Sequence, residues 1–285
     1  MNVESFRDWP NGWAILYATF AHGGHLYGKV RLNKYLAVLQ REGFPVPNKF
    51  ENKQMGPYDR HIDDEAASLQ SAQLLEINKR PSGKPLDLFE YALTVDGAQF
   101  VRHAIFPRID ALPFRESYRA IITSTTYLFR SNTEKVVDRL HKDLYLDDKR
   151  GFADHLNKTM AEIRRLIGSA EARRSDECEL CLDLLGTLDF ALRCLEEVRK
   201  SHLDDGLTGK HNILFNAERL ADDAREAVNH EHMLILDDSS PSNSRLLSEK
   251  LKHRLHCLEY NADLYGVVTP IDPSTYEFLE FVVAH

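Results

Sequence analysis

The sequence contains no long apolar run and few cysteines. Over its 285 residues, no stretch approaches the ~18 consecutive apolar residues that a membrane-spanning helix needs. Residues 1–11 are polar and charged, and no apolar segment follows them, so we expect no signal peptide. Four cysteines in a chain without a secretory signal are typical of reduced thiols. These absences predict a soluble, cytoplasmic protein that makes no contact with a membrane.

The sequence also lacks the short motifs of common enzymes. None of GxxxxGK[ST], GxGxxG, HExxH and GxSxG occurs in it. The segment His22-Gly-Gly-His25 is interpreted as a turn between two helices, because glycine supplies the positive φ that a tight connection requires. The sequence therefore favours a non-enzymatic protein, and we predict no cofactor.

An apolar stripe with helical spacing runs through the N-terminal third. It follows the i, i+3, i+4, i+7 pattern and consists of Leu32, Tyr35, Leu36 and Leu39. Gly43 stands where a left-handed helix end is expected, and the prolines of 44–47 cannot continue a helix. Pro57 is predicted to open a second helix, because proline is tolerated at the first helical position. We expect Leu36 and Tyr58 to lie in the core, and the second helix to bury Tyr58, Ile62, Ala66 and Leu69.

A β-hairpin is predicted after this second helix. The segment 74–77 is a short strand candidate, and 86–94 alternates well enough to return antiparallel to it. Thr94 can then cap a further helix over 96–103. Helices followed by a two-stranded hairpin predict a winged-helix-like module over 1–106 in a mainly α-helical protein.

Four sequence fragments of this module resemble a known family. They are GKxxLNKYLxxLQxxG from Gly28, MGPYD from Met55, LLEI from Leu74 and YALTxxG from Tyr91. Together they resemble the YwgA-type group, which is related more distantly to the Panacea (SocA-like) antitoxin domains, over residues 10–105. The resemblance implies a winged-helix-like module of bacterial or archaeal regulatory, toxin–antitoxin or antiphage-defence systems, without catalytic residues.

The remainder, residues 107–285, is predicted to form an acidic helical bundle. The first 106 residues carry equal numbers of acidic and basic side chains, so the net charge of −8 lies beyond them. Such a bundle is a poor nucleic-acid surface, because phosphates attract clustered lysine and arginine. Apolar periodicity predicts helices near 114–130, 132–145, 151–173, 176–203, 211–231, 244–265 and 273–283, with an exposed loop at 237–244.

Two cysteines in the bundle have a spacing that metal sites use. Cys178 and Cys181 form a C-x-x-C pair, which zinc sites and thiol oxidoreductases share. Zinc needs four ligands, and Cys194 lies ~20 Å further along the same predicted helix at ~1.5 Å per residue. We therefore interpret the pair as small apolar residues of a packed helix and predict no metal.

A second pattern in the bundle is compatible with catalysis. Arg225 and His230 have the loose R-x4-H spacing of HEPN-type ribonucleases, in which histidine acts as acid or base and arginine steadies the phosphate. Glu226, next to the arginine, would repel a scissile phosphate. We favour a solvent-facing helix end, with a HEPN-like ribonuclease as the alternative.

Six basic residues of the N-terminal module could contact nucleic acid. They are Lys29, Arg31 and Lys34, around the start of the first helix of the stripe, and Lys79, Arg80 and Lys84, around the wing turn. In helix-turn-helix proteins the second helix enters the major groove. Here that helix carries Asp59, Asp63, Asp64 and Glu65, which oppose entry between phosphates.

A protein contact through this surface is therefore favoured over base-reading DNA binding. We predict a non-enzymatic regulatory or interaction protein whose partner is another protein, such as a toxin, an effector or a regulatory subunit. A transcriptional regulator that touches duplex DNA through its wing is the alternative, and a homo-oligomer remains open.

Overall fold

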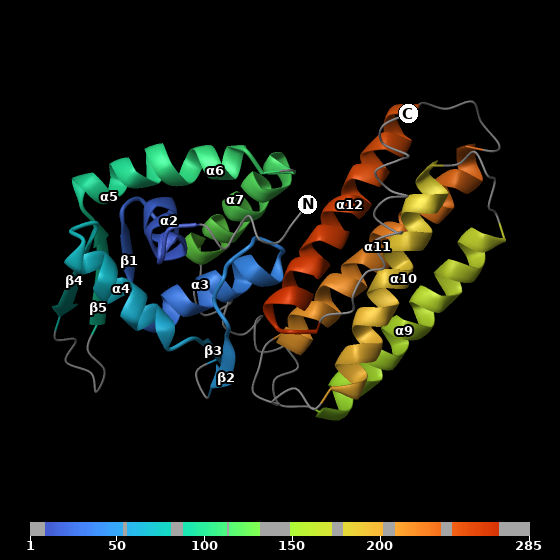
Figure 1. The fold of residues 1–285 in the computed structure, drawn as a ribbon, viewed down its shortest axis with the longest axis horizontal. Coiled ribbons are helices and arrows are strands. Elements are labelled where there is room, and N and C mark those ends of the chain that lie inside the picture. Colours follow the sequence, from blue (N-terminus) through green and yellow to red (C-terminus); the bar gives the residue numbers. More distant parts are fainter. Residues whose placement is uncertain are drawn as a thin grey trace. The chain divides into compact units, whose positions relative to one another are not determined.

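The computed structural model is mainly helical and contains a small antiparallel sheet (Figure 1). It describes residues 9–53, 56–80, 88–112, 114–131, 149–172, 179–201, 209–234 and 241–267. The chain divides into two compact units. We call their described parts the N-terminal unit, residues 9–131, and the C-terminal unit, residues 149–267. No described helix has both the length and the apolar character required to cross a bilayer.

The N-terminal unit alternates short helices and strands. In chain order these are α2 (Trp13–Ala21), β1 (His25–Tyr27), α3 (Lys29–Arg41), β2 (Glu51–Lys53), β3 (Gly56–Tyr58), α4 (His61–Ser71), β4 (Leu75–Arg80), β5 (Leu88–Leu93), α5 (Val95–Phe100), the π-helical turn η1 (Val101–Ile105), α6 (Phe106–Asp110) and α7 (Arg115–Ser131). The sheet order is β1-β5-β4, and both pairings are antiparallel. The predicted hairpin is confirmed, with Leu75 opposite Leu93.

Two local predictions in this unit are wrong. The segment after the glycine pair Gly23-Gly24 enters strand β1, which pairs with β5, instead of a helix. Pro57 does not open a helix either. It lies in β3, which pairs with β2, and α4 starts only at His61. Gly56 has φ +98°, which is outside the helical region, so the chain must turn before the helix can begin.

The core of the N-terminal unit forms around α3. The stripe predicted for this helix is at most 1% exposed, and Leu36 is fully buried as predicted. Tyr58 is only partly buried, because it lies in β3 and its hydroxyl donates to Asp63 (3.2 Å). Large buried residues that pack with the stripe include Ile15, Leu16, Phe44, Val46, Phe50, Tyr91, Tyr118 and Phe129.

Helix α7 belongs to this core, so the N-terminal unit extends beyond the predicted boundary at residue 106. Tyr118, Ile122 and Phe129 of α7 are buried in it. The Tyr35 hydroxyl also forms a hydrogen bond with the Thr126 hydroxyl (2.8 Å), which links α3 to α7. The periodicity that predicts this helix does not reveal which core it joins.

A close backbone contact fixes the junction between the sheet and α5. A Cβ at Gly97 would lie 1.9 Å from the Leu74 carbonyl oxygen, so no side chain fits there. The Thr94 hydroxyl accepts a hydrogen bond from the Gly97 N–H (2.9 Å), as the predicted cap requires. The same hydroxyl donates to the Gln73 carbonyl oxygen (2.7 Å). These contacts explain why the YALTxxG fragment has a threonine at 94 and a glycine at 97.

The C-terminal unit is a bundle of long helices that lie side by side (Figure 1). Its described helices are α9 (Lys149–Glu171), α10 (Glu179–Lys200), α11 (Gly209–Leu234) and α12 (Pro241–Leu264). They confirm four of the predicted helices, and α7 confirms a fifth. The helices predicted at 132–145 and 273–283 lie outside the described residues. Helix α12 begins at Pro241, inside the predicted loop 237–244.

Polar side chains in the bundle core link α11 to α12. Asn212 donates to the Asn261 side-chain oxygen (3.4 Å), and Asn261 donates to the Cys257 carbonyl (2.9 Å). Both asparagines are at most 2% exposed. A buried polar pair disfavours alternative helix alignments in which it would lose its partner.

Three histidines of the bundle are shielded from solvent: His253 and His256 are buried, and His211 is half-buried. Burial lowers the pKa of His211 to about 4, that of His253 to about 3 and that of His256 to about 4. Each is therefore neutral in the folded protein at pH 7. His253 lies against the Cys257 thiol, with Nε2 and Sγ 3.6 Å apart. The thiol and the imidazole are both buried, which favours packing over reactivity.

We expect the bundle to lose stability as the pH falls from 6.5 towards 4. The folded-state pKa of each of these three histidines lies below its unfolded value, so the unfolded chain binds more protons in this window. At ~1.4 kcal/mol per pH unit and group, the loss between pH 6.5 and 5 is about 2 kcal/mol per histidine. Urea titrations followed by far-UV circular dichroism at several pH values measure it.

The variant His253→Met should flatten this pH dependence, because it removes one of the groups that titrate in this window. Both tryptophans, Trp9 and Trp13, lie in the N-terminal unit, so their fluorescence separates its unfolding from that of the bundle. Equal stability of the bundle at pH 6.5 and pH 5 would contradict the expectation.

Candidate functional site

The buried carboxylate of Asp59 positions the start of α4. Asp59 is 4% exposed and directly follows β3. Its Oδ2 accepts hydrogen bonds from the Asn48 side chain (3.2 Å) and the Lys49 N–H (3.1 Å). Its Oδ1 accepts from the His61 N–H (3.0 Å) and lies 2.9 Å from His61 Nδ1. The Asp59 N–H itself donates to the Asn33 side chain (2.8 Å). One residue thus joins α3, the segment before β2, and α4.

Lys29 is held against α4 and the sheet by two contacts. Its Nζ lies 2.9 Å from the Asp63 carboxylate and 4.5 Å from the centre of the Phe89 ring. The partly buried ion pair is worth up to ~1 kcal/mol and the cation–π contact ~0.5–1 kcal/mol. Exchanging these contacts for a DNA phosphate would therefore gain little net energy.

The other two basic residues predicted on α3 to contact nucleic acid, Arg31 and Lys34, are held within the protein. Arg31 donates to the Phe129 carbonyl (2.7 Å), and burial lowers the pKa of its guanidinium. Lys34 is 3% exposed. Neither side chain can reach a phosphate backbone without leaving its place in the fold. The three basic residues predicted on α3 are thus close in the sequence. In the fold, each lies against or inside the rest of the N-terminal unit.

The wing residues are only partly within the described structure. Lys79 lies exposed on β4, and Arg80 is the last residue of that strand. Lys84 lies outside the described residues. Of these three side chains the structure describes that of Lys79, which lies on the surface of the hairpin.

The acidic residues predicted on α4 are present, but only one of them, Asp64, is exposed. Asp63 and Asp64 lie in its first turn, where the positive end of the helix dipole stabilises them. Asp63 neutralises Lys29, whereas Asp64 is exposed. Burial raises the pKa of Glu65, whose carboxylate lies 3.5 Å from the Asn48 side chain. The exposed bases of this helix end are Arg60 and His61.

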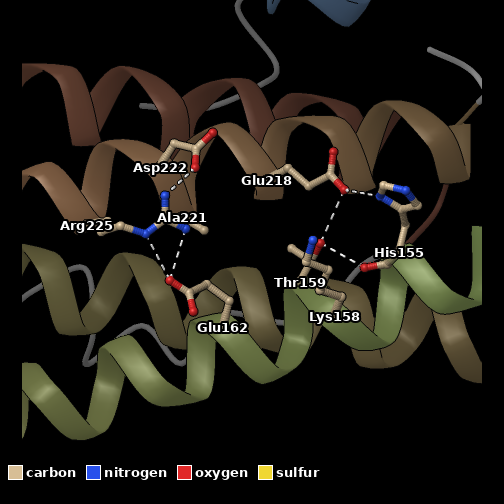
Figure 2. Close-up of a pocket in the computed structure, with 8 residues that line it drawn as sticks. All are labelled: His155, Lys158, Thr159, Glu162, Glu218, Ala221, Asp222 and Arg225. Carbon is tan, nitrogen blue, oxygen red and sulfur yellow. Dashed lines mark hydrogen bonds and ion pairs between the residues drawn. The ribbon is translucent and has the colours of Figure 1, made fainter. Parts of the chain in front are cut away.

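A polar groove crosses the C-terminal unit between α9 and α11 (Figure 2). We call it the α9–α11 groove. It has a volume of about 290 Å³ and is lined by His155, Lys158, Thr159, Glu162, Glu218, Ala221, Asp222 and Arg225. Figure 2 shows that six of these side chains interact in two clusters. One contains His155, Thr159 and Glu218, and the other contains Glu162, Asp222 and Arg225.

The first cluster does not form a nucleophilic triad. Glu218 Oε1 accepts from the Thr159 hydroxyl (3.3 Å) and lies 3.2 Å from His155 Nδ1. The Thr159 hydroxyl also lies 2.9 Å from the His155 carbonyl oxygen. A nucleophile needs a base that contacts its hydroxyl, and here the carboxylate lies between the hydroxyl and the imidazole. The cluster fastens α9 to α11.

The second cluster occupies Arg225, a candidate catalytic residue. Its Nε and Nη2 both donate to Glu162 Oε1 (3.0 Å each), and its Nη1 donates to Asp222 (2.8 Å). Hydrogen bonds from Arg165 and Arg225 hold the pKa of Glu162 at about 2, so the carboxylate stays ionised. The guanidinium is thus already neutralised by two carboxylates.

The backbone of α11 also separates the two candidate positions. Arg225 and His230 lie in one continuous helix, which runs to Leu234. Five residues at ~3.6 per turn rotate the second position by ~140° about the helix axis relative to the first. The two positions therefore lie on different faces of α11.

The cysteine pair lies outside what the structure can test. Cys178 is not among the described residues, and only the backbone of Cys181 is described, in α10. The cysteines whose side chains are described, Cys194 and Cys257, are buried. Within the described residues, no group of three His, Cys, Asp or Glu side chains is placed to hold a metal ion.

The sequence analysis missed the residues that build these arrangements. Asn33 is a polar residue inside an apolar helical stripe, and this interruption is a signal for a buried hydrogen bond. The contact between His155 and Glu218 joins residues 63 positions apart, and no local pattern announces it.

Comparison of the chain with models of protein families, with curated proteins and with solved structures gave no match. The resemblance to the YwgA-type group therefore rests on the sequence fragments alone.

Replacing Asp59 with alanine should strongly destabilise the N-terminal unit. The change leaves buried donors of Asn48 and Lys49 without an acceptor, and losing one partner of a buried charged network costs ~3–5 kcal/mol. Urea unfolding followed by tryptophan fluorescence measures it. Asp64→Ala is the matched control, because an exposed carboxylate of the same helix should change stability by less than ~0.5 kcal/mol. A cost below ~1 kcal/mol for Asp59→Ala would show that water replaces the carboxylate.

We expect purified protein to leave a 5′-labelled RNA intact over hours, with and without a chelator. The reason is that Arg225 is neutralised and its position does not converge with that of His230. A catalytic acid or base contributes ~10²–10⁴-fold to rate, so its removal could not pass unnoticed. Metal-independent cleavage that disappears in a folded His230→Ala variant would establish the ribonuclease alternative.

Proposed function

We propose that this protein is a non-enzymatic, cytoplasmic regulatory or interaction protein with a winged-helix-like N-terminal unit. The order of elements supports this: α2, β1, α3, α4, β4 and β5 follow one another, with the short β2–β3 pair inserted between α3 and α4. Strand β5 lies between β1 and β4. Helix, strand, two helices and a returning hairpin is the order that defines a winged helix. The sequence fragments that resemble YwgA-type and Panacea domains lie in these same elements.

We further propose that the face formed by α4 binds a partner protein. The observation that carries this proposal is the internal use of the α3 bases. Lys29 is paired with Asp63, Arg31 with a backbone carbonyl, and Lys34 is buried. A duplex-binding face needs several lysine or arginine side chains aimed at phosphates. A partner with complementary basic groups suits the acidic first turn of α4 better than DNA does.

The setting of this function follows from the resemblance. A winged-helix-like module of this type suggests a regulatory, toxin–antitoxin or antiphage-defence system, with a toxin, an effector or a regulatory subunit as the partner. The acidic bundle fits such a protein contact, because a net negative surface keeps the chain away from nucleic acid. A wing-led DNA contact is the second candidate, and exposed Lys79 on β4 is the observation that favours it.

Duplex DNA should bind only weakly, and any salt dependence should come from the hairpin. If Lys79, Arg80 and Lys84 each contact one phosphate, the plot of log K against log salt has a slope of at most about −2.7, at ~0.9 per contact. Replacing all three with alanine should abolish that slope. Fluorescence anisotropy with a labelled random duplex measures it. The matched control replaces Lys49, Lys53 and Arg115, which are exposed bases of the same unit outside the hairpin. A steep slope that survives the hairpin variant would place a DNA site elsewhere.

Partner binding should depend on the charge of α4. In affinity purification from the native host, a protein retained by the wild type should be lost from Asp64→Lys, because the change places a cation where we propose a basic partner docks. Asp96→Lys, on α5, is the matched control for an exposed carboxylate elsewhere in the unit. Equal recovery with both variants would exclude α4 as the docking face.

A further inference from the structure

A second groove lies in the N-terminal unit. It lies where the end of α2, the start of β1 and the first turns of α5 and η1 meet, and its volume is about 490 Å³. We call it the Arg102 groove. Its apolar walls include Phe20, Leu93, Val95 and Ala98, and its ionisable side chains are His25 and Arg102. The volume lies within the ~300–1,000 Å³ typical of small-molecule sites.

The charge of the Arg102 groove is unlike that of the whole chain. The described residues that line it include two bases and no carboxylate, although the chain carries a net charge of −8. The Thr94 hydroxyl on its rim is already used by the Gln73 carbonyl and the Gly97 N–H. The groove therefore offers positive or hydrogen-bond-donating groups next to an apolar wall.

Arg102 is uncommitted, in contrast to Arg31 and Arg225. Its guanidinium carbon lies 5.7 Å from the centre of the Phe20 ring. Within the described residues it makes no hydrogen bond and no ion pair, so its N–H donors remain for a ligand. It is the second residue of the π-helical turn η1. Such a turn adds a residue to the helical winding and is frequent at functional sites.

His25 is oriented from behind by a buried acid. Its Nδ1 lies 3.1 Å from Glu90 Oε1, and the side chain of Glu90 is 4% exposed. This contact holds the imidazole at the edge of the groove. More than half of the side chain is exposed, so a ligand can reach it.

We propose that the Arg102 groove binds a small organic anion. The anionic group lies on Arg102, whose planar fork of N–H donors matches a carboxylate with two parallel hydrogen bonds. The apolar body lies against Phe20, Leu93 and Ala98. This ligand site is independent of partner binding by α4, so either proposal can fail without the other.

The test is a titration of the full-length protein with phenylacetate, phenyl phosphate and the neutral phenylacetamide, followed by two-dimensional NMR. Ligands of this size reach a Kd of about 0.1–1 mM. We expect phenylacetate to shift the resonances of His25, Val95 and Ala98. Phenyl phosphate in place of phenylacetate would identify the anionic group as a phosphate. Equal binding of phenylacetamide, or no binding of any probe, would overturn the proposal.

Variants of Arg102 localise the effect. Arg102→Gln should weaken binding of the anion at least ~10-fold, because it removes a charge-assisted pair of hydrogen bonds. Arg102→Lys keeps the positive charge but loses the planar fork of N–H donors. Its Kd for the anion should therefore lie between those of the wild type and Arg102→Gln. Arg115→Gln, at an exposed arginine of the same unit, is the matched control and should bind as the wild type does. An unchanged Kd in a folded Arg102→Gln variant would also refute the site.

Discussion

The N-terminal unit depends on one buried carboxylate. Asp59 receives hydrogen bonds from the segment before β2 and from the first turn of α4, while its own N–H is held by α3. A carboxylate with 4% exposure is tolerable only while its acceptor positions are filled. Asp59 therefore fixes the point at which α3, the segment before β2 and the start of α4 meet. This contact also orients the first turn of α4.

This constraint explains why the MGPYD fragment looks like a helix start and is not one. Gly56 and Pro57 belong to strand β3, which pairs with β2, and α4 begins only at His61. The acid that suits a helix N-terminus is present, but it acts from outside the helix through the His61 N–H. The sequence rules for proline and acidic residues were sound in this case. What they lack is the partner strand, which pairs through a backbone register that composition does not encode.

Long periodic segments were predicted best. The stripe of α3, the hairpin β4–β5 and the helices α7 and α9–α12 follow from local spacing, because burial on one face imposes a period of 3.6 or 2. The membership of α7 in the N-terminal core did not follow, because Tyr118 and Phe129 look the same whichever core receives them. Strand β1 was missed because three residues carry too little pattern.

The candidate site was the least predictable part, and the cause is electrostatic. A sequence reports formal charge, whereas a ligand meets only the charge left over after internal pairing. Lys29, Arg31 and Arg225 are equally basic on paper, yet each is held by a partner within its own unit. Arg102 carried no motif and attracted no attention in the sequence, although the fold leaves it facing a groove. The three-dimensional structure is needed to tell an arginine that is held by an internal partner from one that faces a groove.

The hydroxyl of Thr94 has a consequence for how the N-terminal unit assembles. It caps α5, the first part of a helical run that continues through η1 and α6 to Asp110, and it donates to the Gln73 carbonyl, 21 positions earlier in the chain. Most of the stability of a helix in a protein comes from its tertiary contacts. The cap is completed only when the turn between α4 and β4 has closed on it, with the Leu74 carbonyl against Gly97. Because the cap and the turn complete each other, we expect α5 and the β4–β5 hairpin to form and to melt together.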